Sequence, residues 1–200
     1  MQAVPRHQCF IYDGSPALNV PCLGNAILGM LSRDYRCLYL NDEPMLAAMR
    51  AYLAESGLNV ERAIESGRLV LSSDRNHLMN GRFDLKSMLA GLKAALDEAL
   101  NDDYAGLFAT GDMSWEFGPD ADFAELMDYE WQLEDFFEAH PQLSGICQYN
   151  AGVFPHEVTQ QALTAHPAIF INDELSLPNP HFAHPRLAPL RSIRIDPGLA

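Results

Sequence analysis

A histidine and a cysteine stand close together in the first apolar segment of the chain, HQCFIY. In an extended strand, residues two apart lie on one face, so His7 and Cys9 share a face while Phe10 and Tyr12 share the other. A histidine beside a cysteine can take the thiol proton and create a nucleophile. The sequence offers neither an oxyanion hole nor a third group to orient the histidine. We therefore favour a packed thiol and a hydrogen-bonded core histidine.

Two glutamates interrupt the apolar stripe of a helix that we predict over residues 122–139. At 100° per residue, Glu130 and Glu134 fall in the middle of that stripe. A carboxylate there must find a donor or face a wet cavity, because unpaired burial is strongly unfavourable. Two interpretations stay open: Glu130 lines a pocket and accepts a hydrogen bond from a ligand, a Tyr or a His, or Trp131 and Phe136 rotate the helix and leave both glutamates in water. The apolar members of the stripe are Phe123, Leu126, Met127, Leu133 and Phe137.

The residues after the first apolar segment lack the phosphate-binding loop of nucleotide-binding proteins. Such a loop ends in Gly-Lys-Ser/Thr, so that backbone N–H groups and the lysine hold the phosphates. Here Gly14 stands alone and the nearest lysine is Lys86. Asp112, which follows another apolar segment, is either a relic of a Mg²⁺-binding acidic residue or a turn aspartate that bonds its own backbone. Tight ATP binding through this loop is not expected.

The four cysteines form no C-x-x-C pair, so their spacing does not support a structural zinc site. Most of them lie in apolar segments, and we expect buried free thiols. They are Cys9, Cys22, Cys37 and Cys147.

Short apolar segments alternate with helical patterns along the chain. Alternation of this kind predicts right-handed βαβ units and an α/β fold with a doubly wound, mainly parallel sheet that carries helices on both faces. Helix starts are marked by Asp42-Glu43-Pro44, Asp84 and Pro155, and the last of these helices ends at His166-Pro167. The predicted strands are His7–Tyr12, Arg36–Leu40, Arg68–Ser72, Tyr104–Thr110, Gly145–Tyr149 and Ala168–Asn172.

Ligands of open α/β sheets bind beyond the carboxyl ends of the strands. Polar or aromatic residues follow the predicted strands at that edge, which is where we expect a pocket. They are Tyr12 and Asp13, Asn41 to Glu43, Asp112 to Glu116, Tyr149 and Asn150, and Asn172 to Glu174.

Length and charge limit the function. Two hundred residues suit one domain, which we place at residues 1–176, followed by a proline-rich irregular tail at 177–200. The net charge of −14 argues against direct nucleic-acid binding, since the basic residues are scattered apart from Arg186, Arg191 and Arg194. We see no transmembrane run and no leader, and therefore expect a cytoplasmic protein without membrane contact.

An ordered set of motifs resembles the MEDS domain over roughly residues 6 to 175. That family is a sensory domain of histidine kinases in methanogens and of the dichloromethane-responsive regulator of methylotrophs. The motifs, in order, are His7–Tyr12, Arg36–Tyr39, Gly111–Trp115, Tyr129-Glu130 and Cys147–Asn150.

The resemblance implies a three-layer sandwich related to the RecA and KaiC-type ATPases, without their phosphate loop, that senses small hydrocarbon derivatives. It also implies that the strand of Cys147 neighbours the strand of Cys9. The family's motif positions, together with Asp112 from the strand-end argument, give the ligand-site candidates. They are His7, Cys9, Tyr12, Asp112, Trp115, Glu130, Cys147 and Tyr149.

We therefore expect a sensor that binds a small molecule between Tyr12, Trp115, Glu130 and Tyr149, with no catalysis, no cofactor and no metal. Since the sequence shows no kinase or DNA-binding domain, its output would pass through a partner kinase or regulator, or through a homo-oligomer. Two alternatives remain: a degenerate KaiC-like nucleotide-binding or ATPase domain, and a regulatory protein-interaction domain that has no ligand.

Overall fold

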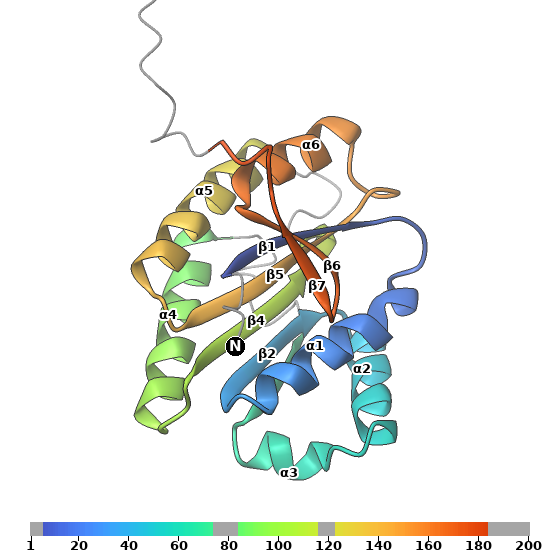
Figure 1. The fold of residues 1–200 in the computed structure, drawn as a ribbon, viewed down its shortest axis with the longest axis vertical. Helices are drawn as coiled ribbons and strands as arrows, with labels where there is room; N and C mark the ends of the chain where they lie inside the picture. Colours follow the sequence, from blue (N-terminus) through green and yellow to red (C-terminus); the bar gives the residue numbers. More distant parts are fainter. Residues whose placement is uncertain (1–5, 74–83, 116–122, 184–200) are drawn as a thin grey trace, which may run out of the picture.

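The computed structural model describes residues 6–73, 84–115 and 123–183, and shows a sheet of seven strands in the order β3-β2-β4-β5-β1-β6-β7 (Figure 1). Every neighbouring pair is parallel except β6 and β7. The middle strand of this order is β5, and β1 lies beside it between β5 and β6. The strands are β1 (His7–Tyr12), β2 (Tyr35–Asn41), β3 (Leu69–Ser73), β4 (Gly106–Asp112), β5 (Leu143–Asn150), β6 (Ala168–Asn172) and β7 (Leu175–Pro178).

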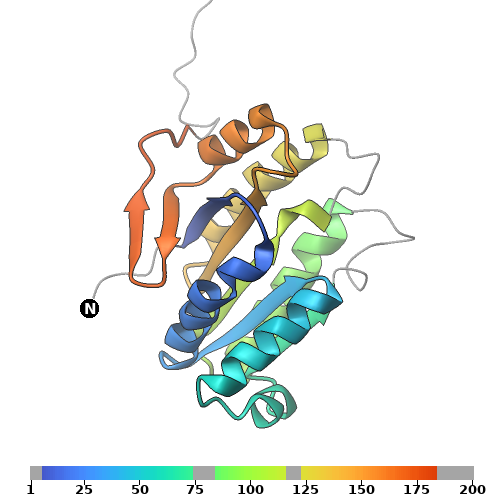
Figure 2. The ribbon, with the colours of Figure 1, turned by 90° about the vertical axis from the view of Figure 1, so that its right-hand side faces the viewer.

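Helices cover both faces of the sheet. In Figure 2, α1 and α2 lie on the near side of the strands, while α4 and α5 lie on the far side. Two buried apolar clusters fill the spaces between these layers, one under α1–α3 and the other under α4–α6. The α/β doubly wound fold is thus confirmed. The helices are α1 (Val20–Leu31), α2 (Glu43–Glu55), α3 (Val60–Glu65), α4 (Leu85–Asn101), α5 (Phe123–Ala139) and α6 (His156–Ala165), with 3-10 turns η1 (Pro16–Asn19) and η3 (Met113–Trp115).

The predicted helix starts coincide with observed caps. The side chain of Asp42 accepts a hydrogen bond from the Met45 N–H, and that of Asp84 accepts one from the Ser87 N–H. Each cap satisfies a backbone donor that the first turn of a helix leaves without an internal partner. The six predicted strands are all present, with ends that shift by at most two residues.

The structure adds elements that the sequence patterns did not indicate. The helix α1 follows β1 where we looked only for a phosphate loop, and β7 pairs antiparallel with β6. We placed the start of an irregular tail at Leu177, but Leu177 pairs with Ile169 and Pro178 pairs with Ala168, so the sheet continues past that boundary. Residues 184–200 lie outside the described residues.

In the described ranges, no helix is both long and apolar enough to cross a membrane.

Candidate functional site

The structure divides seven of the eight predicted site residues between the two faces of the sheet. Strand alternation places His7, Cys9, Cys147 and Tyr149 on the α4–α6 face, where Glu130 of α5 meets them. Tyr12 belongs to the apolar cluster on the α1–α3 face, where it contacts Asp112. The side chain of Trp115, at the end of η3, lies outside the described residues. The expected pocket between Tyr12, Glu130 and Tyr149 is therefore interrupted by the sheet itself.

We use the name buried polar cluster for six side chains on the α4–α6 face. Strands β1 and β5 bring His7 and Cys147 close together. His7 pairs with Gly145, and Cys147, two residues farther along β5 on the same face, pairs with Cys9. The family resemblance implied that the strands of Cys9 and Cys147 are adjacent, and this is confirmed. Gly145 leaves room for α5, since a Cβ there would lie 2.6 Å from the Ala109 carbonyl oxygen and 2.9 Å from the Phe137 ring. The members of the cluster are His7, Glu130, Glu134, Cys147, Tyr149 and His166.

His7 is fully buried and held from both ends of its ring. Its Nδ1 lies 2.7 Å from Glu134 Oε2, and its Nε2 lies 3.4 Å from Cys147 Sγ. Phe137 stacks on the imidazole at a centroid distance of 4.5 Å. Burial lowers the pKa of His7 from 6.5 to about 3, so the ring is neutral at pH 7. A neutral ring that donates Nδ1–H to Glu134 presents an unprotonated Nε2 to the centre of the cluster.

Glu130 is the carboxylate at the middle of the cluster and is also fully buried. The Tyr149 hydroxyl donates a hydrogen bond to its Oε1, while Oε2 lies 3.2 Å from His166 Nε2 and 3.5 Å from His7 Nε2. Burial raises the pKa of Glu130 from 4.5 to about 8, although the bond from Tyr149 opposes this shift. Glu130 and Glu134 are both buried, so neither lies in water, and Glu130 accepts its hydrogen bond from Tyr149. Glu130 does not line either of the two cavities described below.

His166 joins the cluster although the sequence marked it only as the end of a helix. Its Nδ1 lies 2.7 Å from the Ala162 carbonyl oxygen, and its own carbonyl accepts a hydrogen bond from Asn179 Nδ2 at 2.7 Å. The ring lies 4.0 Å from that of His7, centroid to centroid. Burial lowers the pKa of His166 well below 6.5. Nothing in the local sequence indicates this role, because the contacts come from segments far apart in the chain.

On the opposite face, Tyr12 and Asp112 form a pair near the carboxyl ends of β1 and β4. The Tyr12 hydroxyl donates to Asp112 Oδ2 at 2.5 Å, and Asp112 Oδ1 accepts from the Ser114 N–H at 2.8 Å. Burial, followed by the bond to Asp112, raises the pKa of Tyr12. Asp112 thus makes the backbone bond of a turn aspartate. Nearby, Asn150 Nδ2 donates to the Gly14 carbonyl oxygen at 3.2 Å, which ties β5 to the loop after β1.

A cavity of about 660 Å³ lies between α1 and the β1–β6–β7 part of the sheet and extends to α5. Its volume falls in the usual range of small-molecule pockets. Glu134 lines this cavity and also holds His7, so the cavity and the buried polar cluster share a side chain. The lining includes Gln8, Asn25, Gly29, Met30, Phe108, Ile146, Phe170 and Leu177.

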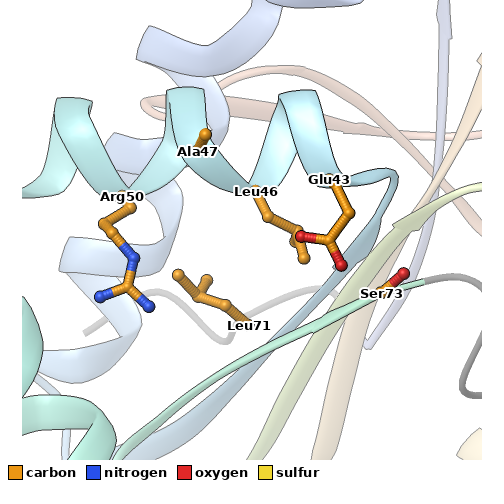
Figure 3. Close-up of a pocket in the computed structure, with 6 residues that line it drawn as sticks. All are labelled: Glu43, Leu46, Ala47, Arg50, Leu71 and Ser73. Atoms are coloured by element: carbon orange, nitrogen blue, oxygen red, sulfur yellow. The ribbon is translucent and has the colours of Figure 1, made fainter.

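A smaller cavity of about 290 Å³ lies between α2 and β3. Figure 3 shows Glu43 and Arg50 projecting from α2 beside Leu71 and Ser73 of β3. Arg50 forms an ion pair with Glu61 of α3. Glu43 is the one member of the predicted strand-end set among the six residues that line this cavity.

The chemistry of the buried polar cluster favours binding over nucleophilic attack. The Cys147 thiol contacts His7 Nε2. Burial, followed by the Glu130 carboxylate, raises the pKa of the Cys9 thiol well above its usual value. A protonated thiol is a poor nucleophile. Three of the four free cysteines, Cys9, Cys37 and Cys147, are buried, as expected.

Four side chains of the cluster also bring metal-ligating atoms together. One such atom from each of His7, Glu130, Cys147 and His166 lies within 4.8 Å of the other three.

Comparison with known proteins agrees with this architecture. The family model described as MEDS, the methanogen/methylotroph, DcmR sensory domain, matches residues 6–167. The chain is also similar to the transcriptional repressor DcmR of Methylorubrum extorquens (strain DSM 6343 / CIP 106787 / DM4), with 29% identity over 167 residues. The aligned region covers 80% of this chain and 57% of the repressor, so the chain spans less than two thirds of that relative's length.

Proposed function

The chain belongs to the MEDS family of sensory domains, and from this premise we propose that it binds a small molecule, without catalysis, and transmits the bound state to a protein partner. The observation that carries the proposal is the 660 Å³ cavity whose lining includes Glu134. A ligand in this cavity touches the side chain that orients His7. Occupancy of the cavity would therefore alter the buried polar cluster.

The proposed transmission depends on Glu134 having two surroundings, one with and one without ligand. A ligand shifts a protein between two states only by binding one of them better. A ligand group that donates a hydrogen bond to Glu134 competes with His7 Nδ1 for the same carboxylate. Since Glu134 and Glu130 lie on α5, a change at either carboxylate bears on the packing of that helix against α6.

The partner is part of the proposal. Transcription regulation is the role of the similar repressor, and a sensory domain needs an effector to act on. Either a kinase or regulator polypeptide or a second copy of this chain could receive the signal. The ligand class that we propose is a small hydrocarbon derivative that carries a polar group, because the cavity lining combines apolar with charged side chains. The apolar ones include Met30, Phe108, Ile146 and Phe170, and the charged ones are Arg6, Arg33, Glu134, Glu138, Asp173 and Glu174.

A thermal-shift screen tests this proposal. The panel contains small halogenated and methylated compounds, common metabolites, and ATP and ADP with Mg²⁺. A ligand present at about 100 times its dissociation constant adds about 2.7 kcal/mol of stability. We expect stabilisation by a member of the first group. Stabilisation by nucleotides alone would instead favour the degenerate ATPase alternative, and a panel without any shift would contradict small-molecule sensing.

Two matched glycine substitutions locate the ligand. Gly29 lines the cavity from α1, and Gly91 lies on α4; a Cβ at either position meets no atom within 4 Å. Gly29→Phe should place its ring in the cavity and abolish the shift, whereas Gly91→Phe should keep it. A ligand that stabilises both variants equally binds elsewhere, and the assignment to this cavity would then be wrong.

A further inference from the structure

We propose that His7, Glu130, Cys147 and His166 together bind one divalent transition-metal ion of the zinc class. The inference does not depend on the small-molecule ligand proposed above. It runs against the expectation from cysteine spacing, because the four residues come from β1, α5, β5 and the end of α6 and form no sequence motif.

The distances already approach those of a tetrahedral metal site. With metal–ligand bonds of about 2.0–2.3 Å, neighbouring ligand atoms lie about 3.3–3.8 Å apart. Glu130 Oε2 lies 3.2 Å from His166 Nε2 and 3.5 Å from His7 Nε2, and Cys147 Sγ lies 3.4 Å from His7 Nε2. The four ligand atoms lie within 4.8 Å of one another. An adjustment of about 1 Å in the longest separation would complete the tetrahedron.

Lone pairs converge on the same point. Both imidazoles use Nδ1 toward an oxygen acceptor, His7 toward Glu134 and His166 toward the Ala162 carbonyl, so both neutral rings direct an unprotonated Nε2 inward. Within the described part of the chain, Glu130 Oε2 and His166 Nε2 are buried without a hydrogen-bond partner. A cation bound between these two atoms would give each of them a partner.

Each nitrogen and oxygen ligand is oriented by a second residue, as in established metal sites. Glu134 fixes His7, the Ala162 carbonyl fixes His166, and the Tyr149 hydroxyl binds the other oxygen of Glu130. Contacts of this kind hold the tautomer and the ring orientation, and their loss typically lowers metal affinity 10–100-fold.

The donor types select the class of ion. Imidazole and thiolate ligands suit Zn²⁺ and neighbouring transition metals, whereas Mg²⁺ and Ca²⁺ take oxygen ligands. A carboxylate ligand and a thiolate ligand would together carry two negative charges. A divalent cation neutralises both, so that the loaded site buries no net charge.

Titration of the chelator-treated protein with Co²⁺ tests the site. Tetrahedral Co²⁺ gives visible ligand-field bands, and a thiolate ligand adds a near-ultraviolet charge-transfer band. We expect both bands, and we expect them to saturate at one Co²⁺ ion per chain. Added Zn²⁺ should displace Co²⁺ and remove the bands, which should return only when Co²⁺ is in large excess. A protein that shows neither band in excess Co²⁺ would overturn the proposal.

The two neighbouring cysteines give a matched pair of variants. Cys147→Ser should abolish the charge-transfer band and weaken Co²⁺ binding at least 10-fold, whereas Cys9→Ser, at the paired position on β1, should leave both unchanged. Circular dichroism of both variants checks that they are folded. If Cys147→Ser does not fold, Tyr149→Phe supplies the second test, with an expected 10–100-fold weaker Co²⁺ affinity. A charge-transfer band that survives in folded Cys147→Ser, or an unchanged affinity in Tyr149→Phe, would contradict the site.

Discussion

On the α4–α6 face of β1 and β5, His7, Cys147 and Tyr149 lie among buried carboxylates, whereas on the α1–α3 face the same two strands present Phe10 and Ile146 to an apolar core. The second face also carries buried polar groups, but they bond in separate pairs: Tyr12 with Asp112, Gln148 with Thr110 and Gln8 with Ser176. The two faces share backbone and register. Their difference shows that a strand can supply a packing surface and a chemical site at once, provided that a helix on one side brings the partner groups.

The partner groups come from α5 and from the residue after α6. Glu134 and Glu130 lie one turn apart on α5, and His166 follows the last turn of α6. The face under α1 and α2 receives mainly apolar side chains from its helices, including Leu23, Ile27 and Met49. We therefore expect substitutions on the two faces to alter stability by similar amounts, but to alter metal binding only on the α4–α6 face.

The largest expected effects come from paired leucine truncations. Leu126 of α5 and Leu23 of α1 are both almost fully buried. Leu126→Ala and Leu23→Ala should each lower the free energy of unfolding by about 2–5 kcal/mol, because each leaves a cavity in the core. Urea denaturation measures both. Only Leu126→Ala should also weaken Co²⁺ binding, since α5 carries Glu130; an equal loss of affinity in both variants would remove the distinction between the faces.

Removing the residue that orients His7 should have the next largest effect. Glu134→Ala leaves the buried Nδ1–H of His7 without its carboxylate, which should lower the free energy of unfolding by about 1–3 kcal/mol. The exposed Gln132→Ala on the same helix should change it by less than about 0.5 kcal/mol. Thermal unfolding of the chelator-treated variants compares the two. Equal stability would show that Glu134 does not support His7.

The free energy of unfolding of the metal-free protein should depend on pH through the Glu130 carboxyl. Its pKa rises from 4.5 to about 8 on folding, so the folded state binds more protons between these values, and stability is lost as the pH rises through that window. With chelator present, the free energy of unfolding should fall by up to about 1.4 kcal/mol per pH unit between about pH 6 and 8 from this group. Groups that face Glu130 are His7, Cys147, Tyr149 and His166, with Cys9 and Glu134 nearby.

The comparison variant is Glu130→Gln, which cannot titrate. Its profile should be flatter than that of the wild type above pH 6, while Glu55→Gln, an exposed position on α2, should keep the wild-type slope. Urea denaturation at several pH values measures this. The same alkaline slope in Glu130→Gln and wild type would place the responsible group elsewhere.

The smallest expected effect is on the apolar face. Tyr12→Phe removes the hydrogen bond to Asp112, which keeps its bond from the Ser114 N–H. The free energy of unfolding should fall by about 0.5–1.5 kcal/mol, with no change in Co²⁺ affinity. Thermal unfolding and Co²⁺ titration of the same sample measure both quantities. A loss of Co²⁺ binding in Tyr12→Phe would mean that the two faces are coupled through the sheet.

Local signals predicted much of this fold. The β-rich segments, the capping aspartates Asp42 and Asp84, and the alternation of strand and helix gave the class and six of the seven strands, because these features depend on neighbouring residues. The helix α1 was missed because its segment was examined only for a phosphate loop. The strand β7 was missed because its pairing with β6 lies beyond the last recognised strand.

The site was predicted less completely. The stripe of α5 indicated that Glu130 could accept a bond from a tyrosine or a histidine, and the family resemblance named His7 and Cys147. The contribution of His166 depends on the end of α6 meeting β1, and no spacing encodes that contact. Tyr12 was grouped with Glu130 because both stood near strand ends or motif positions, whereas strand alternation places them on opposite faces.

The most direct test of the contrast between the faces is a crystal structure of the protein as purified, with anomalous diffraction recorded above and below the zinc edge. The account predicts one anomalous peak per chain on the α4–α6 face, with His7, Glu130, Cys147 and His166 at about 2.0–2.3 Å from it. A cluster without such a peak after crystal growth in Zn²⁺, its imidazoles bonded only to protonated Glu130 and to the Cys147 thiol, would contradict it.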